Sequence, residues 1–216
     1  MPGKGAIPFN MFTGIIEATS KVTQTINSSG LKAVTIELPK TFNDLRLGVS
    51  IACDGICLTV SKLNPNSFTV EIMQETVQKT TAGNWRSGTI LNLERALKLG
   101  DRLDGHLVLG HIDRTSKLLE KKMVTATTYF RFSLDSRDRE LIVKQGSVAI
   151  NGVSLTIAEL NSNSFTVALV TYTLDNTNLR YLAPNSSVNV EYDIVGKYIQ
   201  TLYHNSYFKP SYEKNL

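Results

Sequence analysis

The residues best suited to chemistry lie in two short segments of nearly the same sequence. Residues 50–60 contain Cys57 before a Leu-Thr pair, and residues 147–157 contain Ser154 before the same pair. A thiol or a hydroxyl becomes a nucleophile when a base stands next to it, although a cysteine is more often a small buried hydrophobe. A thiol and a hydroxyl at equivalent places indicate two related but non-identical small-molecule pockets.

The segment that joins these motifs carries two histidines. His106 and His111 both fall in Gly105-His-Leu-Val-Leu-Gly-His111, whereas the matching residues 12–15 contain no histidine. Histidine titrates near neutral pH, so one half of the chain has gained a proton-transfer group that the other lacks. The alternative is a structural histidine satisfied by its neighbours. Asp193 and Lys144 are further polar candidates, with a solvated surface charge as their alternative.

The remaining composition excludes several classes of protein. Cys53 and Cys57 have no second cysteine pair, which argues against a zinc site, and the chain has no P-loop or Gly-x-Gly-x-x-Gly motif. The net charge of +4 is spread without a polybasic block, so we expect neither nucleic acid nor a membrane as partner. Two free thiols without a signal peptide favour the cytoplasm.

An internal repeat with an offset of 97 residues relates the two halves. Residues 50–94 and 147–191 align without a gap, with 16 of 45 positions identical. An offset of 96 also aligns Gly14 with Gly110. The chain is therefore two copies of one unit of about 95 residues, because chance similarity does not hold one register for so long.

Each unit is predicted to be all-β. Short, alternating, β-branched runs and Asp-Gly or Asn-Pro turns are typical of strands. The predicted strands are residues 34–38, 50–60, 67–73 and 90–94, and in the second copy 129–134, 147–157, 165–170 and 187–193. We expect two tandem six-stranded Greek-key barrels related by the repeat, with a short helix near 76–83 in one copy and 173–181 in the other.

A different period follows the second barrel. Ile194, Tyr198, Ile199, Leu202 and Tyr203 recur every three or four residues, which predicts a C-terminal α-helix with one apolar face. That face either mediates oligomerisation or packs on its own barrel. The expected organisation is a leader (1–10), an N-terminal barrel (11–105), a C-terminal barrel (106–193), a terminal helix (194–208) and a tail (209–216).

Four motifs in this order resemble the riboflavin synthase family. They are residues 11–17 (Met-Phe-Thr-Gly-Ile-Ile-Glu), 53–60, 105–113 and 150–157, and the resemblance covers about residues 11–203. It implies a transferase that takes two molecules of 6,7-dimethyl-8-ribityllumazine and moves a four-carbon unit between them, giving riboflavin and 5-amino-6-ribitylaminouracil. It implies no cofactor and no metal, a homotrimer held by the terminal helices, and a possible association with lumazine synthase.

The resemblance also implies the site residues. Those matched to the N-terminal barrel are Gly14, Ile15, Ile16, Ser50, Cys57, Leu58, Thr59, Glu71, Ile72, Met73, Gln74, Glu75 and Thr76. Those matched to the C-terminal barrel are Gly110, His111, Ile112, Lys144, Ser147, Ser154, Leu155, Thr156, Leu169, Val170, Thr171, Tyr172, Thr173 and Leu174. Catalytic roles are expected for Cys57, His111, Ser154, Thr156 and Asp193, with His111 moving a proton, Cys57 or Ser154 adding to a lumazine, and Asp193 orienting Ser154.

Two departures from the family pattern concern the second copy. Lys144 precedes Gln145-Gly146, one place earlier than in the family, and Tyr172 stands where the first copy has Glu75. The alternative function is a non-catalytic lumazine- or flavin-binding protein of the same fold. The retained reactive residues favour the enzyme.

Overall fold

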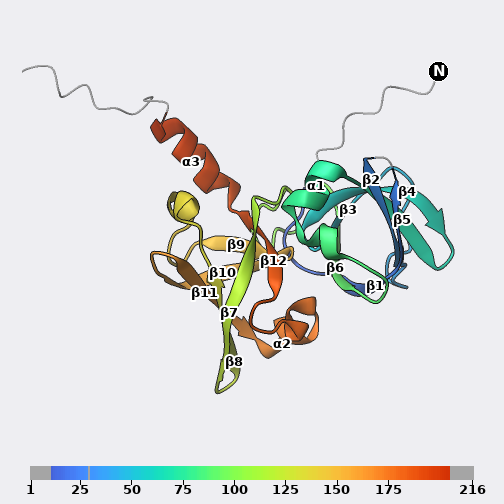
Figure 1. The fold of residues 1–216 in the computed structure, drawn as a ribbon. Helices are drawn as coiled ribbons and strands as arrows, with labels where there is room; N and C mark the ends of the chain where they lie inside the picture. The colour runs from blue at the N-terminus through green and yellow to red at the C-terminus, as the bar shows by residue number, and fades with distance from the viewer. Residues whose placement is uncertain (1–10, 29, 205–216) are drawn as a thin grey trace, which may run out of the picture.

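The computed structural model describes residues 11–28 and 30–204 and shows two closed six-stranded antiparallel barrels (Figure 1). Adding six to each strand number of the first barrel gives the strand order of the second. The first barrel contains β1 (Ala18–Ser28), β2 (Leu31–Glu37), β3 (Ser50–Cys53), β4 (Ile56–Asn64), β5 (Ser67–Met73) and β6 (Ile90–Arg95). The second contains β7 (Arg114–Val124), β8 (Thr127–Ser133), β9 (Ser147–Ile150), β10 (Val153–Leu160), β11 (Ser164–Val170) and β12 (Ser187–Tyr192).

Alternation of apolar side chains gives each barrel its own core. The first core includes Ile36, Phe68 and Leu91, and the second includes Phe132 and Phe165, all of them fully buried. Closure removes the unpaired strand edges that would otherwise promote aggregation. The predicted fold class and the predicted strands are confirmed, but the sequence prediction omitted the long strands β1 and β7.

The helix expected in each unit is divided in two. In the first barrel α1 (Gln74–Lys79) ends at Thr80 and η1 (Thr81–Asn84) follows; in the second, α2 (Thr171–Asp175) and η3 (Asn178–Tyr181) are separated near Thr177. Each threonine hydroxyl donates to the carbonyl four residues earlier, at 2.6 Å for both Thr80 and Thr177. The break places a second backbone turn, η1 or η3, against the opposite barrel.

The barrels meet through two equivalent hairpin turns. Asp54-Gly55 joins β3 to β4 and Asn151-Gly152 joins β9 to β10, with positive φ at all four residues, as a tight hairpin requires. A Cβ on Gly55 would lie 2.7 Å from the Gly152 nitrogen, so neither glycine can carry a side chain. The backbones of the two barrels therefore touch directly.

Buried asparagines around these turns repeat their hydrogen bonds in reciprocal pairs. Asn92 Nδ2 donates to the Asn151 carbonyl (2.9 Å) and Asn189 Nδ2 donates to the Asp54 carbonyl (2.9 Å). Asn178 N donates to Asn92 Oδ1 (2.7 Å), as Thr81 N donates to Asn189 Oδ1 (2.8 Å). This pattern relates the two barrels by a near-twofold symmetry.

Asp54 breaks that symmetry, because its repeat mate is the uncharged Asn151. Burial raises the pKa of Asp54 to about 7, against hydrogen bonds from Asn92 N and Asn178 Nδ2. In the unfolded chain the carboxyl titrates near 3.9, so its contribution to stability is full below that pH and is lost as pH rises through about 7.

Asp54→Asn is therefore expected to weaken the fall in unfolding free energy between pH 4 and pH 7. Glu94 and Glu191 are shifted in the same direction, so the variant should keep part of that fall. Urea titrations across this pH range check the prediction. An unchanged slope in the variant would show that Asp54 is not the titrating group.

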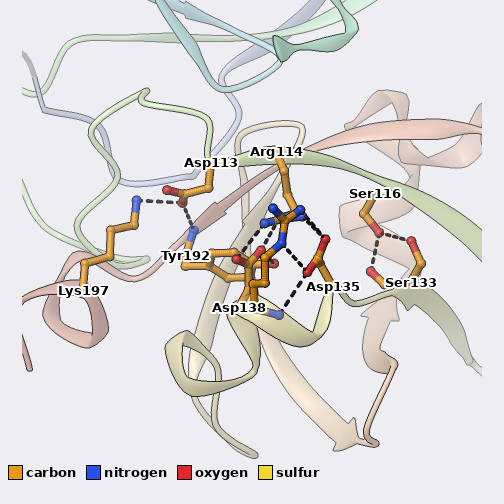
Figure 2. A network of polar contacts seen from close by, with 9 residues as sticks. Asp113, Arg114, Ser116, Ser133, Asp135, Asp138, Tyr192 and Lys197 are labelled. Atoms are coloured by element: carbon orange, nitrogen blue, oxygen red, sulfur yellow. Dashed lines mark hydrogen bonds and ion pairs between the residues drawn. The ribbon is translucent and has the colours of Figure 1, made fainter. Parts of the chain in front are cut away.

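The terminal helix α3 (Ile194–His204) projects away from the second barrel (Figure 1). Its root lies beside a network in which Arg114 donates to Asp138 (2.8 Å) and Tyr192 Oη donates to the same carboxylate (2.9 Å), while Lys197 pairs with Asp113 (2.7 Å) (Figure 2). The predicted C-terminal helix is confirmed over Ile194–His204, and residues 205–208, which the prediction also placed in it, lie outside the described residues. The predicted leader (1–10) and tail (209–216) lie outside the described residues. No helix in the described part is long and apolar enough to cross a membrane.

Candidate functional site

Two short straps cross each other between the barrels. One is residues 12–14, before β1, and the other is residues 108–110, before β7. They pair as an antiparallel bridge, with Phe12 N donating to the Val108 carbonyl (2.8 Å) and Val108 N donating to the Phe12 carbonyl (3.1 Å). Phe12 and Val108 are buried there against Ala52 and Ala149. The near-twofold axis therefore passes through the straps.

Each strap closes on the barrel of the other copy. Ser154 N donates to the Gly14 carbonyl (2.8 Å), and Cys57 N donates to the Gly110 carbonyl (3.0 Å). A Cβ on Gly14 would lie 2.6 Å from Ser154 Cβ, and one on Gly110 would lie 2.4 Å from Cys57 Cβ. The family resemblance matched residues 14–16 to the N-terminal barrel and residues 110–112 to the C-terminal barrel. In the structure the two straps are exchanged, because Gly14 lies against Ser154 and Gly110 lies against Cys57.

A pocket of about 270 Å³ lies where the second strap meets the first barrel. Its lining combines predicted residues from both halves of the chain with Ile56, Lys79 and Thr80 between them. The predicted residues that it brings together are Cys57, Glu75, Thr76, Gly110, His111 and Ile112. Glu75 is also paired with Lys79, at 2.5 Å on the exposed face of α1. A thiol, an imidazole and a carboxylate thus surround one small cavity.

The equivalent position in the second barrel holds a different pair of groups. Ser154 Oγ lies 2.7 Å from His106 Nδ1. Burial lowers the pKa of His106, and the charge of Asp193 opposes that shift. Asp193 Oδ1 itself accepts from Val195 N (3.0 Å), and its expected role in orienting Ser154 stays a prediction. A neutral imidazole next to a hydroxyl can take its proton.

Paired hydroxyls flank both positions. Ser50 and Thr59 are opposite each other on β3 and β4, and Ser147 and Thr156 are opposite each other on β9 and β10. Burial raises the pKa of the Cys57 thiol, while a hydrogen bond with Ser50 opposes the rise. Hydroxyls both donate and accept, so these pairs suit a heterocycle edge that presents both kinds of group.

Some predicted residues cannot offer a side chain to a ligand. Leu58, Ile72, Leu155 and Leu169 are buried in the barrel cores, which leaves only their backbone groups for contact. The other predicted residues of β5, α1, β11 and α2 are half-buried or exposed at the barrel ends: Glu71, Met73, Gln74, Val170, Thr171, Tyr172, Thr173 and Leu174. Ile15 and Lys144 are exposed and Ile16 is half-buried against the second core.

Three functional candidates are missing from the predicted site residues, although the sequence had singled out His106 as one of two histidines between the repeats. His106 is 48 residues from Ser154, and only the fold joins them. Glu94 and Glu191 are repeat mates that are nearly fully buried, and each accepts hydrogen bonds from one strap. The sequence did contain a signal for these two glutamates. A carboxylate found at the same position of two apolar strands is expected to be buried, and a buried carboxylate needs a hydrogen-bond partner.

Comparison with known proteins agrees with the two-repeat organisation of the chain. The model of the lumazine binding domain matches residues 13–96 and again residues 109–193. The chain is 40% identical over 190 residues to the riboflavin synthase of Actinobacillus pleuropneumoniae, covering 88% of both chains. It is 37% identical over 194 residues to that of Bacillus subtilis, covering 90% of both.

Solved structures show the same fold. The crystal structure of LumP complexed with riboflavin superposes with a TM-score of 0.78 at 22% identity, covering 84% of this chain and 98% of that chain. LumP complexed with 6,7-dimethyl-8-(1'-D-ribityl) lumazine gives a TM-score of 0.76 at 21% identity, with the same coverage. The chain, an enzyme of the transferase type with two lumazine-binding repeats, belongs to the riboflavin synthase family.

Proposed function

We propose that the protein converts two molecules of 6,7-dimethyl-8-ribityllumazine into riboflavin and 5-amino-6-ribitylaminouracil by moving a four-carbon unit from one to the other. The observation that carries this proposal is the pair of equivalent strand segments with different reactive groups, Cys57 in one and Ser154 with His106 in the other. A reaction between two copies of one substrate needs two similar pockets, while donor and acceptor need different chemistry.

The proposed chemistry begins at the acidic C7 methyl group of a lumazine. His111 lines the first pocket and Ser154 contacts a buried imidazole, so both are placed to move a proton. Cys57, Ser154 or water adds to the partner lumazine and activates it. Thr156 and the other paired hydroxyls hold the pyrimidinedione edge. The negative charge of Asp193 acts on His106 and opposes the lowering of its pKa by burial.

The test is to mix the purified protein with 6,7-dimethyl-8-ribityllumazine and follow lumazine absorbance and riboflavin fluorescence. Riboflavin appearing as lumazine disappears supports the proposal, and His111→Ala and Ser154→Ala should both slow that turnover. Binding without conversion would replace the proposal with a non-catalytic lumazine-binding function, in keeping with the LumP complexes. No binding would refute both functions.

The proposed assembly is a homotrimer held by α3. No residue of this helix is buried, and five apolar side chains stay exposed: Val195, Tyr198, Ile199, Leu202 and Tyr203. The alternative, that this face packs on its own barrel, leaves no such surface. The proposed active site combines the N-terminal barrel of one subunit with the C-terminal barrel of its neighbour. The proposed compartment is the cytoplasm, where the free thiols of Cys53 and Cys57 stay reduced.

Leu202→Glu is expected to convert the trimer to monomers, because it places a charge in the apolar face that the subunits share. Thr201→Glu on the neighbouring polar position is the matched control and should remain trimeric. Sedimentation velocity distinguishes the two species. A wild-type protein that sediments as a monomer at all concentrations would contradict the assembly.

A further inference from the structure

Glu191 and Glu94 hold the two straps with both oxygens of a carboxylate. Leu109 N donates to Glu191 Oε1 (2.8 Å) and Gly110 N to Oε2 (3.0 Å). Thr13 N donates to Glu94 Oε1 (2.6 Å) and Gly14 N to Oε2 (3.0 Å). A carboxylate that accepts two parallel amide bonds fixes both the position and the orientation of the segment that it holds.

The strap that each carboxylate holds belongs to its own copy of the repeat, but it closes the pocket of the other copy. Glu191 lies on β12 of the second barrel, and its strap ends on Cys57 of the first barrel through the Gly110 carbonyl. Glu94 lies on β6 of the first barrel, and its strap ends on Ser154 of the second. Each carboxylate is thus connected through the strap that it holds to the reactive residue of the opposite barrel.

We infer that Glu191 and Glu94 are positioning residues that act across the barrels, each latching the strap that closes the substrate pocket of the opposite repeat. The inference rests on the proposed function in that it takes the Cys57 and Ser154 pockets to hold the two lumazines. Glu191 is not among the residues that line the Cys57 pocket. Each sets how tightly a pocket is covered and where its glycine carbonyl stands.

The two latches differ in strength. Thr13 adds a hydroxyl bond to Glu94 Oε1 (2.8 Å), whereas the residue matched to it in the second copy, Leu109, has no such group. Glu94 therefore accepts three hydrogen bonds and Glu191 accepts two. The Glu191 latch, which covers the Cys57 pocket, is the weaker one and should open more often.

The charges around each latch also differ. Burial raises the pKa of both glutamates to about 7; Glu17 adds to the rise at Glu94, while Lys197 opposes and Asp113 supports it at Glu191. Lys197 comes from α3 and is also paired with Asp113 (2.7 Å), which ties the helix root to the weaker latch (Figure 2). Burial is the main cause of the raised pKa of the Cys57 thiol, and the Glu191 charge adds to that rise.

The experiment is alkylation of the full-length protein with iodoacetamide, with the labelled peptides quantified by mass spectrometry. Glu191→Gln replaces one acceptor oxygen with an amide that cannot accept, and it should speed labelling of Cys57 about tenfold, the cost of one hydrogen bond to a charged group. Glu94→Gln, the matched control, should leave the Cys57 rate unchanged. Cys53 is fully buried and reports global opening, so its rate should stay low in both variants.

The reciprocal arm uses the chain's own repeat mates. In a Cys57→Ser, Ser154→Cys background, the thiol at position 154 should label faster with Glu94→Gln and not with Glu191→Gln. Glu191→Asp, whose shorter side chain reaches only one amide, serves if the glutamine variant fails to fold. Equal responses to both variants, no response to either, or Cys53 labelling as fast as Cys57 would overturn the inference.

A pH series separates the latch from a simple charge effect. Loss of the Glu191 charge alone shifts the midpoint of the Cys57 rate profile and leaves its plateau at high pH unchanged. Loss of the latch raises the plateau rate itself, because the pocket is open in a larger fraction of the molecules. No lumazine is present in these measurements, so their failure leaves the proposed reaction standing, and a protein that makes no riboflavin can still show the latch.

Discussion

Gly110→Ala is expected to reduce the proposed riboflavin formation by at least about 100-fold, since a shift of about 1 Å in a substrate pocket costs that much. Gly110 has φ = +79°, a conformation that disfavours any side chain. An added Cβ would also lie 2.4 Å from Cys57 Cβ and 2.7 Å from Cys57 N. Backbone cannot move aside as a flexible side chain can, so the strap must lift and Cys57 N must lose its acceptor.

Gly88→Ala provides the matched control. Gly88 has a similar φ of +88°, but nothing lies within 4 Å of an added Cβ. Both variants carry the conformational strain, and only Gly110→Ala carries the clash. Steady-state turnover, read with thermal melting of each variant, checks the prediction. Equal activity in the two variants would mean that the strap does not set the pocket.

Asn92→Ala is expected to lower the free energy of unfolding by about 3 kcal/mol or more, because it leaves several buried groups without partners, at about 1–3 kcal/mol each. Asn92 is fully buried. Its Nδ2 donates to the Asn151 carbonyl and to Asn178 Oδ1 (3.0 Å), and its Oδ1 accepts from Asn178 N. All three bonds cross from one barrel to the other.

The repeat mate gives a graded comparison. Asn189 makes two such bonds, with Thr81 N and the Asp54 carbonyl, so Asn189→Ala should cost less than Asn92→Ala. The single tryptophan, Trp85, is buried in the first barrel and its fluorescence reports that barrel, whereas circular dichroism reports both. Weaker contact between the barrels in Asn92→Ala should make the urea transition followed by fluorescence differ from the one followed by circular dichroism. Coincident transitions with an unchanged midpoint would contradict a role in joining the barrels.

Local pattern was enough to predict the barrels. Residues 56–60 and 153–157 alternate after an Asp-Gly or Asn-Gly turn, and the structure bends the chain there into hairpins. β1 and β7 were harder to predict, because only their first halves alternate between buried and exposed side chains and the rest is almost entirely exposed. The break at Thr80 also left no clear signal, since a threonine hydroxyl bonded to the preceding turn competes with the helix only once the chain is folded.

The exchange of straps lies beyond what a repeat can show. An alignment of Gly14 with Gly110 shows that the two residues are equivalent, but it does not show which barrel each one covers. A strap folded on its own barrel and a strap folded on the other present the same local sequence. The choice depends on contacts between residues far apart in the chain, such as Gly14 with Ser154, and the same holds for His106.

The crossed straps also bear on how a duplicated gene could come to specialise. A single ancestral barrel with this strap would have been completed only by a second molecule, so its two sites were necessarily identical and depended on concentration. Joining two copies in one polypeptide makes that encounter intramolecular, with an effective concentration of about a millimolar for a short tether. Once the copies were tethered, each site could change alone, and the thiol at Cys57 and the hydroxyl at Ser154 are the record of that divergence.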